Sequence, residues 1–286
     1  MVRETSMAPR EPRERFNVNL NSQFYENIAT IYDSIYDDVD AEEAVRQWCL
    51  LVTECANLPR PNQDVLPRLL DLGCGTGKYL DPWAAAGFCV TGADASGGMI
   101  SCARRRRRLS GLSSRIHLVH CDLREPNLSL NKAGPFDIAV AHFNFFNLLP
   151  PGDISMLLER LASCMTVEAR LFTDCASPGL MPEKTRDRIV VADGAVVEVV
   201  TRPNPAAGTV TRSYRIHASQ ISERYWLHST PTLRAAATQA GWRLERTYAW
   251  TPDCPQDPWH PIRNRRTAHR LCVFKLISSL ARQPSR

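Results

Sequence analysis

The chain contains a glycine-rich segment, Asp71-Leu72-Gly73-Cys74-Gly75-Thr76-Gly77-Lys78-Tyr79, which follows two apolar residues and precedes a run with helical character. A strand that passes through such a turn into a helix brings several backbone N–H groups to one point, where a ligand can bind them. Because glycine has no Cβ, the ligand can also approach the backbone closely. The segment therefore predicts a binding site for a nucleotide-like cofactor.

Three kinds of cofactor compete for this turn. A phosphate-binding NTPase loop needs Gly-Lys followed by Ser or Thr, whose hydroxyl binds Mg²⁺, whereas Lys78 is followed here by Tyr79. A dinucleotide fold needs the spacing G-x-G-x-x-G, whereas Gly73, Gly75 and Gly77 are spaced G-x-G-x-G. This departure counts against NAD without excluding it. The third candidate is S-adenosylmethionine, whose methionine end carries no phosphate and needs no Mg²⁺ ligand.

Acidic residues end the next two strands that the sequence predicts. Asp94 follows the apolar run 88–93, about 20 residues beyond the turn, where a carboxylate can hydrogen-bond the hydroxyls of a ribose. NAD enzymes and S-adenosylmethionine enzymes both use this device, so it indicates a ribose rather than one cofactor. Asp122 follows the strand 116–121. A single aspartate at such a place is more often a turn residue or a helix cap, but its spacing from Asp94 favours a role in binding.

The predicted elements bring these residues to one place. Residues 66–175 alternate strand and helix, which predicts a parallel sheet with helices on both faces. Ligands of such sheets bind at the carboxyl ends of the strands. Gly73, Asp94, Asp122 and His142 each follow directly on a predicted strand, so we expect all of them at one edge of the sheet.

Together these segments resemble the class I S-adenosylmethionine-dependent methyltransferases, in particular their small-molecule N- or O-methyltransferase branch. The resemblance rests on the Asp-x-Gly-x-Gly-x-Gly turn, on Asp94-Ala95-Ser96-Gly97-Gly98-Met99 opening a helix, and on a final strand pair, 242–250 and 269–277. It is strongest over residues 69–149 and continues in the right order to about residue 276. It implies a Rossmann-like α/β fold with a seven-stranded, mostly parallel sheet and a terminal antiparallel hairpin, and S-adenosyl-L-methionine as the cofactor.

The resemblance also assigns roles to residues of this chain. The glycine turn would hold the methionine end of the cofactor, Met99 would pack on the adenine ring or simply in the core, and Asp122 would accept a hydrogen bond from the adenine amino group. Tyr32 belongs to a segment in which a Tyr-Asp pair closes over the cofactor in the family. The cofactor-binding residues predicted in this way are Tyr32, Asp71, Gly73, Gly75, Gly77, Asp94, Ala95, Met99, Asp122, Leu123 and His142.

Methyl transfer is an in-line displacement, for which a protein must exclude water, align the nucleophile and, where needed, remove a proton. His142 is the first candidate base, although the residue here often contacts the cofactor's amino group through its carbonyl in the family. His228 is the second, with capping beside Ser229 as the alternative. The predicted substrate-contacting residues, each of which also suits a core position, are Tyr25, Phe143, Asn144, Asn147 and Tyr225.

The chain divides into a core and three additions. We expect a mobile tail over residues 1–22, an N-terminal helical cap over 23–65, and a methyltransferase core over 66–182 and 229–286. Residues 183–228 contain alternating apolar runs around Asp-Gly, which predicts an antiparallel β lid over the substrate site, or else a plain extension of the sheet. In the cap, helical spacing of apolar residues predicts two helices, over 24–38 and 40–57.

The composition is that of an ordinary globular protein, with 286 residues, 44% hydrophobic residues, 23% charged residues and a net charge of +5. No apolar run approaches the roughly 18–20 residues that span a bilayer. The ten cysteines show no metal-like spacing and mostly lie in apolar contexts, which predicts reduced thiols and a cytoplasmic protein. We therefore expect no metal, no membrane contact and a small-molecule substrate; the oligomeric state stays open.

An arginine run, 104–108, is the exception to the mild charge. Its residues point all round a helix, which favours a solvated helix end over a nucleic-acid surface, since no aromatic residues interleave with the arginines. Nucleic-acid substrates are also disfavoured because residues 142–149 lack the motifs of base-methylating enzymes. Two alternatives remain open: an RNA or protein methyltransferase that uses this run, and a non-catalytic cofactor-binding protein.

Overall fold

A computed structural model describes residues 19–36, 40–56, 66–125, 128–191, 194–250, 259–261 and 269–277. The first helices are α1 (Asn19–Ile28), α2 (Tyr32–Ile35) and α3 (Ala41–Cys55), and those of the core are α4 (Leu80–Ala85), α5 (Gly97–Leu109), α6 (Leu128–Ala133), α7 (Pro151–Ala162) and α8 (Thr230–Gln239). Short 3₁₀ turns are η1 (Ser113–Arg115), η2 (Phe145–Leu148) and η3 (Pro178–Leu180). None of the helices in this described part is long and apolar enough to cross a membrane.

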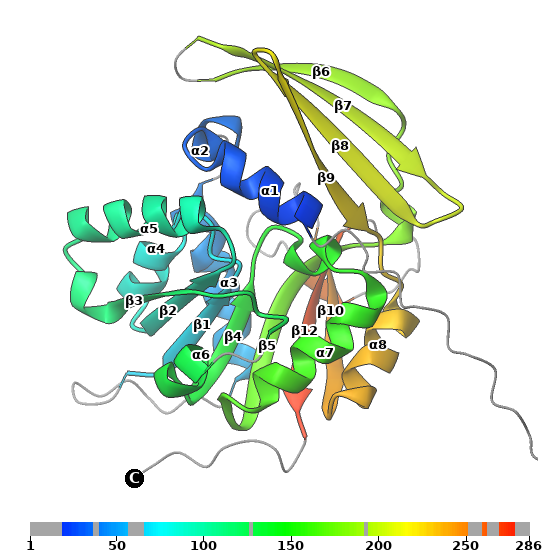
Figure 1. The fold of residues 1–286 in the computed structure, drawn as a ribbon. Helices are drawn as coiled ribbons and strands as arrows, with labels where there is room; N and C mark the ends of the chain where they lie inside the picture. Colours follow the sequence, from blue (N-terminus) through cyan, green and yellow to red (C-terminus); the bar gives the residue numbers. More distant parts are fainter. Residues whose placement is uncertain are drawn as a thin grey trace, which may run out of the picture.

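The large sheet has eight strands in the order β11-β10-β12-β5-β4-β1-β2-β3 (Figure 1). Its strands β1 to β5 run parallel to one another, whereas β12 is antiparallel to both β5 and β10. The seven-stranded, Rossmann-like sheet with a terminal antiparallel hairpin is thus confirmed, and a short edge strand, β11, extends it. The strand bounds are β1 Arg68–Leu72, β2 Cys89–Asp94, β3 Ile116–His120, β4 Phe136–Ala141, β5 Met165–Ala176, β10 Trp242–Trp250, β11 Trp259–Pro261 and β12 His269–Leu276.

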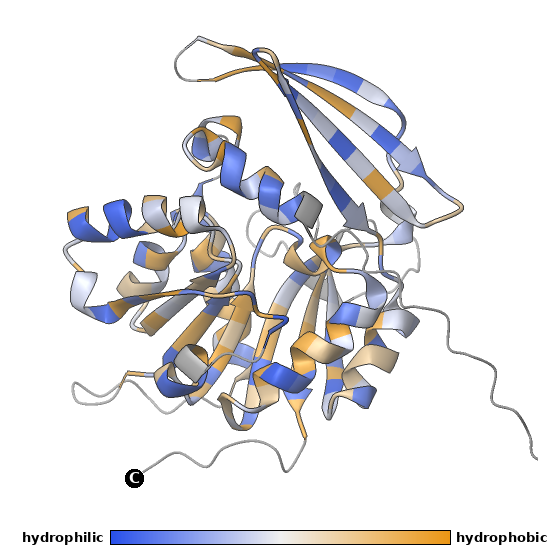
Figure 2. Ribbon diagram, viewed as in Figure 1, coloured by the Kyte–Doolittle hydropathy of each residue, from blue (hydrophilic) through white to orange (hydrophobic). Residues whose placement is uncertain are grey.

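The central strands of the large sheet consist largely of apolar residues (Figure 2), and helices cover both faces of the sheet. On one face α7 and α8 bury residues such as Leu157 and Leu233. On the other face α3, α4 and α5 bury residues such as Val45 and Ile100. The glycine turn lies at the end of the sheet where β1 to β5 have their carboxyl termini (Figure 1).

A second, antiparallel sheet has four strands in the order β6-β7-β8-β9, namely β6 Thr185–Val190, β7 Val196–Asn204, β8 Thr209–Ile216 and β9 Ser219–Trp226. Alternate residues of β7, such as Val197 and Val199, are buried, so one face of this sheet is covered. That face packs on Phe24 and Ile28 of α1. In Figure 1 the helices α1 and α2 lie between this second sheet and the large one.

The N-terminal region differs from the expectation in two places. The helix expected over 24–38 is two helices, because Ile31 donates its N–H to Ile28 O at 2.9 Å and turns the chain before α2 begins. Helix α1 begins at Asn19, so the end of the range 1–22, expected to be a mobile tail, is helical. The second expected helix is confirmed as α3, where Asp40 Oδ1 accepts hydrogen bonds from the first turn.

His142 lies in an aromatic cluster on the α3–α4 side of the sheet. Its Nε2 accepts a hydrogen bond from Trp83 Nε1 at 3.0 Å, and its ring stacks on Tyr79 with centroids 4.4 Å apart. Trp48 of α3 contacts the ring on a 4.2 Å centroid separation. Burial lowers the pKa of His142 to about 3, so the imidazole is neutral in the folded protein.

This burial makes stability depend on pH. An unfolded histidine has a pKa of about 6.5, so its stabilising contribution is complete above that pH and is lost progressively towards pH 3. Between pH 7.5 and 5.0 we expect the wild type to lose about 2 kcal/mol more of unfolding free energy than a His142→Phe variant. Urea unfolding at both pH values measures this difference. The control is His117→Phe at an exposed position, which should lose as much unfolding free energy as the wild type. Equal losses in all three proteins would contradict the assignment.

Candidate active site

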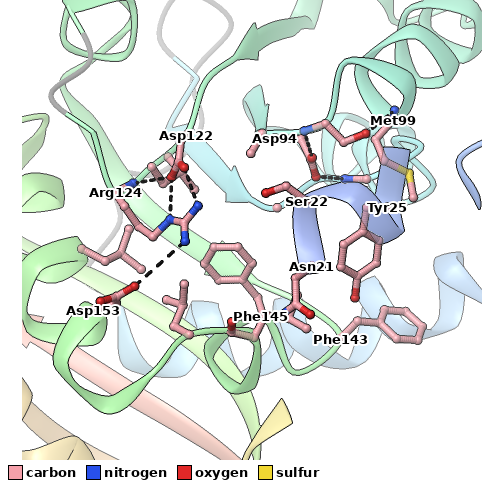
Figure 3. Close-up of a pocket in the computed structure, with 18 of the residues that line it drawn as sticks. Asn21, Ser22, Tyr25, Asp94, Met99, Asp122, Arg124, Phe143, Phe145 and Asp153 are labelled. Carbon is pink, nitrogen blue, oxygen red and sulfur yellow. Dashed lines mark hydrogen bonds and ion pairs between the residues drawn. The ribbon is translucent and has the colours of Figure 1, made fainter. Parts of the chain in front are cut away.

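A cavity of about 880 Å³ lies at the carboxyl ends of β1, β2 and β4, the place that the sequence predicted (Figure 3). Its walls also come from α1, from η2 and the start of α7, and from β9 of the second sheet. Of the predicted cofactor-binding residues, those that line it are Tyr32, Gly73, Gly75, Asp94, Ala95, Met99, Asp122, Leu123 and His142. Of the predicted substrate residues, Tyr25 and Phe143 line it.

The glycine turn has the backbone that the sequence implied. Gly73, Gly75 and Gly77 all have positive φ, at 68°, 55° and 79°. A Cβ on Gly75 would meet nothing within 4 Å and would project into open space at the cavity wall, whereas one on Gly73 would lie 2.5 Å from the ring of Phe145. The turn therefore forms a cradle, and the absence of a side chain at Gly75 leaves its face towards the cavity free for a ligand.

Gly77 and Asp71 do not line the cavity, contrary to the prediction of direct cofactor contact. A Cβ on Gly77 would meet Ala103 of α5 at 3.1 Å, so this glycine allows close packing of the turn on the helix. Asp71 is buried under the turn, where burial first and the charge of Asp94 second raise the pKa of its carboxyl. Its Oδ2 has no hydrogen-bond partner among the described residues.

Asp94 connects the turn to the second strand. Its Oδ2 accepts from the N–H of Gly75 at 2.9 Å and its Oδ1 from the N–H of Ser96 at 2.8 Å. Burial raises the pKa of this carboxyl, while the two backbone hydrogen bonds act in the opposite direction. Each oxygen keeps a lone pair beyond its backbone bond, so the carboxylate can accept from the two hydroxyls of a ribose. The residues present thus fit the predicted cofactor.

Asp122 is held by a residue that the sequence reasoning missed. Arg124 donates Nε to Oδ1 at 2.8 Å and Nη2 to Oδ2 at 2.5 Å, a bidentate pair, and its Nη1 lies 4.0 Å from Asp153 of α7 (Figure 3). Burial alone would raise the pKa of Asp122, but these contacts with Arg124 lower it overall. Met99, at the start of α5, is buried against the core and also lines the cavity, so both of its predicted roles have support.

Asn21 was also missed, because it lay in the range expected to be a tail. Its side chain donates to Leu148 O at 3.2 Å and to Arg224 O at 3.0 Å, and its Oδ1 accepts from the N–H of Arg224 at 2.8 Å. It thereby joins α1, η2 and β9 around the cavity. No local signal marked it, since its partners are distant in the sequence.

Neither predicted histidine base is placed to take a proton. His142 Nε2 already accepts from Trp83, and the low pKa makes the ring a weak base. His228 does not line the cavity; it is buried, and its Nε2 lies 3.0 Å from Phe146 O and 3.1 Å from Leu149 O, to which it can only donate. Both residues contact neighbouring segments through these hydrogen bonds, which do not favour the predicted catalytic role of either.

The other three predicted substrate residues do not line the cavity. Asn147 is fully buried; it donates to Ala176 O and Trp226 O and accepts from the N–H of Ala176, so it bridges η2, β5 and β9. Asn144 lies in a left-handed turn, and its N–H donates to Asp174 Oδ1 at 3.0 Å. Tyr225 lies outside the cavity, under the guanidinium of Arg212 at 5.3 Å.

Comparison with known proteins agrees with this geometry. Residues 69–167 match the methyltransferase domain family. A demethylmenaquinone methyltransferase of Renibacterium salmoninarum is 35% identical over 83 residues, which are 29% of this chain and 32% of the relative. The chain thus aligns with about a third of the length of this relative, over a segment only.

Solved methyltransferase structures match most of the chain at low sequence identity, which shows the fold. CcbJ of Streptomyces caelestis has a TM-score of 0.66 and 18% identity, over 87% of this chain and 99% of that one. The amino pentose methyltransferase CalS10 of Micromonospora echinaspora, solved with S-adenosylmethionine, has a TM-score of 0.57 and 18% identity, over 86% of this chain and 96% of that one. The glycopeptide N-methyltransferase MtfA, also solved with S-adenosylmethionine, has a TM-score of 0.56 and 16% identity, over 84% of this chain and 96% of that one.

The resemblance expected from the glycine turn, Asp94 and the terminal hairpin is confirmed by the family match and the structural likeness. Residues 69–167 match the methyltransferase domain family, and the chain has the fold of the class I S-adenosylmethionine-dependent methyltransferases.

Proposed function

We propose that the protein transfers a methyl group from S-adenosylmethionine to a nitrogen, or to an oxygen, of a small molecule. The observation that carries the proposal is the continuous cavity that joins the Gly75–Asp94 cradle to a space walled by Phe145 and by Trp226 of the second sheet. A cofactor and an acceptor can therefore meet away from water. An amino pentose and a glycopeptide amine, named for two of the similar structures, are acceptors of this class.

The cofactor supplies an electrophilic methyl carbon on a sulfonium. In this chain Gly73 and Gly75 would receive its methionine end, Asp94 its ribose and Met99 its adenine, with Asp122 fixed by Arg124 beside it. These residues bind and orient, and positioning of this kind is a large part of what catalysis of a displacement requires. Asp71 contributes by packing beneath the turn rather than by contact.

The second sheet acts in this proposal as the lid expected over 183–228. Its strand β9 reaches the cavity with Arg224 and Trp226, and Asn21 fastens that strand to α1 and η2. A closed wall excludes water from the acceptor, which favours attack by the acceptor over hydrolysis and strengthens local electrostatic interactions. The expected helical cap over 23–65 contributes Tyr25 and Tyr32 to the same wall.

Nitrogen is the preferred acceptor atom. A neutral amine attacks through its lone pair without prior loss of a proton, whereas a hydroxyl nearly always needs a base. The two histidines that the sequence offered as bases, His142 and His228, are engaged in hydrogen bonds with Trp83 and with backbone carbonyls. Two residues of the arginine run are engaged within the chain, since Arg106 pairs with Asp33 at 2.5 Å and Arg107 donates to Ser113 O, which weakens the case for an RNA or protein substrate.

The cofactor cradle can be tested with a matched pair of glycine variants. Gly75 and Gly208 have similar positive φ, 55° and 63°, and a Cβ at either position would have no neighbour within 4 Å, but only Gly75 lines the cavity. Asparagine tolerates this backbone conformation. We expect Gly75→Asn to weaken S-adenosylmethionine binding about a hundredfold, because its side chain fills the cradle, and Gly208→Asn to leave it unchanged. Calorimetric titration measures both, and equal affinities would refute the placement.

The acceptor can be identified by transfer of a tritiated methyl group to a panel of amino sugars and peptide amines, each paired with its hydroxyl counterpart. We expect label on the amine members and at least about tenfold slower transfer to the hydroxyl members. Transfer to RNA or protein alone would favour the first alternative function. Tight cofactor binding with no transfer to any acceptor would favour the non-catalytic alternative.

A further inference from the structure

A carboxylate in the second sheet has no role in the site described so far. Glu223 of β9 is 0% exposed. Its Oε2 accepts from the hydroxyl of Tyr25 at 3.0 Å, and its Oε1 accepts from the hydroxyl of Tyr214 at 2.6 Å. The first of these phenols comes from α1 and the second from β8, so Glu223 lies where the second sheet meets the N-terminal helices.

Other titratable and charged groups surround this carboxylate on every packed element. Helix α2 contributes Tyr32. Tyr36, which directly follows this helix, has its hydroxyl 3.0 Å from that of Tyr214. Strand β8 contributes Arg212, the positive charge that acts on Glu223, and β9 contributes Tyr225, a further hydrogen-bond donor to it. The charge of the carboxylate is therefore balanced by Arg212 and by phenol donors.

Tyr25 lies between this carboxylate and the cavity. Its ring is part of the cavity wall, near Met99 and Phe143 in Figure 3. A phenol has one hydrogen and two lone pairs, and the hydrogen of Tyr25 is donated to Glu223. The remaining lone pairs make the Tyr25 oxygen a hydrogen-bond acceptor, which suits an N–H group in the cavity.

Resting on the proposed function, we propose that Tyr25 and Glu223 form the proton relay for the acceptor nitrogen. As the nitrogen forms its new N–C bond, the S–C bond breaks and its electron pair stays on sulfur. One N–H proton of the resulting ammonium passes to the Tyr25 oxygen, while the Tyr25 proton passes to Glu223 Oε2. The sulfonium and the carboxylate thus become a thioether and a carboxylic acid, and charge is balanced.

The protonation behaviour of both groups agrees with this order of events. Burial raises the pKa of Glu223 above its ordinary range, which makes the carboxylate a better base near neutral pH. Burial and the charge of Glu223 raise the pKa of Tyr25 well above its usual value, so the phenol stays protonated and passes a proton on. As pH falls through the Glu223 pKa, the carboxylate is lost and the relay stops.

A structural latch would use the same contacts, so the test needs a control within the network. Tyr214→Phe removes a hydrogen bond to the same carboxylate from a ring that is 2% exposed and does not line the cavity. Tyr25→Phe removes only the hydroxyl of a residue that lines the cavity. Glu223→Gln removes the charge and keeps the shape. If these contacts only hold the structure together, all three variants should have similar effects. If they relay a proton, Tyr214→Phe should differ from Tyr25→Phe and Glu223→Gln.

The probes are sinefungin and S-adenosylhomocysteine, which need no known acceptor. Sinefungin carries an ammonium where the cofactor carries its methyl group, so it places N–H donors at the transfer position, and S-adenosylhomocysteine has none there. We expect the wild type to bind sinefungin about tenfold more tightly than S-adenosylhomocysteine at pH 8, with a preference that shrinks as pH falls. Tyr25→Phe and Glu223→Gln should abolish the preference and its pH dependence. Tyr214→Phe should retain the preference, with its pH dependence moved to higher pH because the hydrogen bond that this variant loses lowers the pKa of Glu223 in the wild type.

Calorimetric titration between pH 6 and 8.5 provides these ratios, and affinity for S-adenosylhomocysteine reports whether each variant is folded. A sinefungin preference that is absent in the wild type, or that is unchanged in Tyr25→Phe, overturns the relay while leaving the methyltransferase proposal intact. If wild-type protein binds neither probe, the proposed function itself fails. Should Glu223→Gln not fold, Tyr25→Phe with its Tyr214→Phe control decides the question.

Discussion

The hydrogen bond from the Gly75 N–H to Asp94 Oδ2 fixes the cofactor cradle, on which the proposed chemistry of the cavity depends. It ties the turn after β1 to the end of β2, and the N–H groups of Gly73 and Cys74 reinforce it by donating to Ala93 O. The same carboxylate accepts from Ser96, whose hydroxyl caps α5 at Met99. The glycine turn, strand β2 and helix α5 are thus all joined through Asp94, so the position of each depends on the other two.

This arrangement depends on the layers of the fold. Parallel strands bring their carboxyl ends to one edge, so the topology of the sheet alone places the residues that follow β1, β2, β3 and β4 close together. Helices occupy both faces and leave that edge open. The opening is covered by α1 and β9, which Asn21 joins to η2. A local motif therefore makes the cradle, whereas the closure of the cavity depends on contacts between distant segments.

That difference explains what the sequence could predict. Gly75 and Asp94 were recognisable because their roles follow from the backbone at their own positions. The hydrogen bonds of His142 and Asn147 could not be predicted, because their partners, Trp83 and Trp226, are distant in the sequence. Arg124 lay two positions beyond Asp122, a spacing that could have suggested the ion pair. Substrate class and cytoplasmic location stay predictions.

Glu223 shows how a buried charge can point to function. Its partner Tyr214 belongs to the cluster between the second sheet and α1 that includes Phe24 and Ile28. Replacing a whole buried ionic group by apolar residues of similar volume is often neutral or stabilising, whereas removing Glu223 alone would leave the hydroxyls of Tyr25 and Tyr214 without their acceptor. A carboxylate held there by Tyr25 and Tyr214 imposes a desolvation cost that packing alone does not require. Because Tyr25 also reaches the cavity, proton transfer at the acceptor offers a reason for the charge that the packing does not supply.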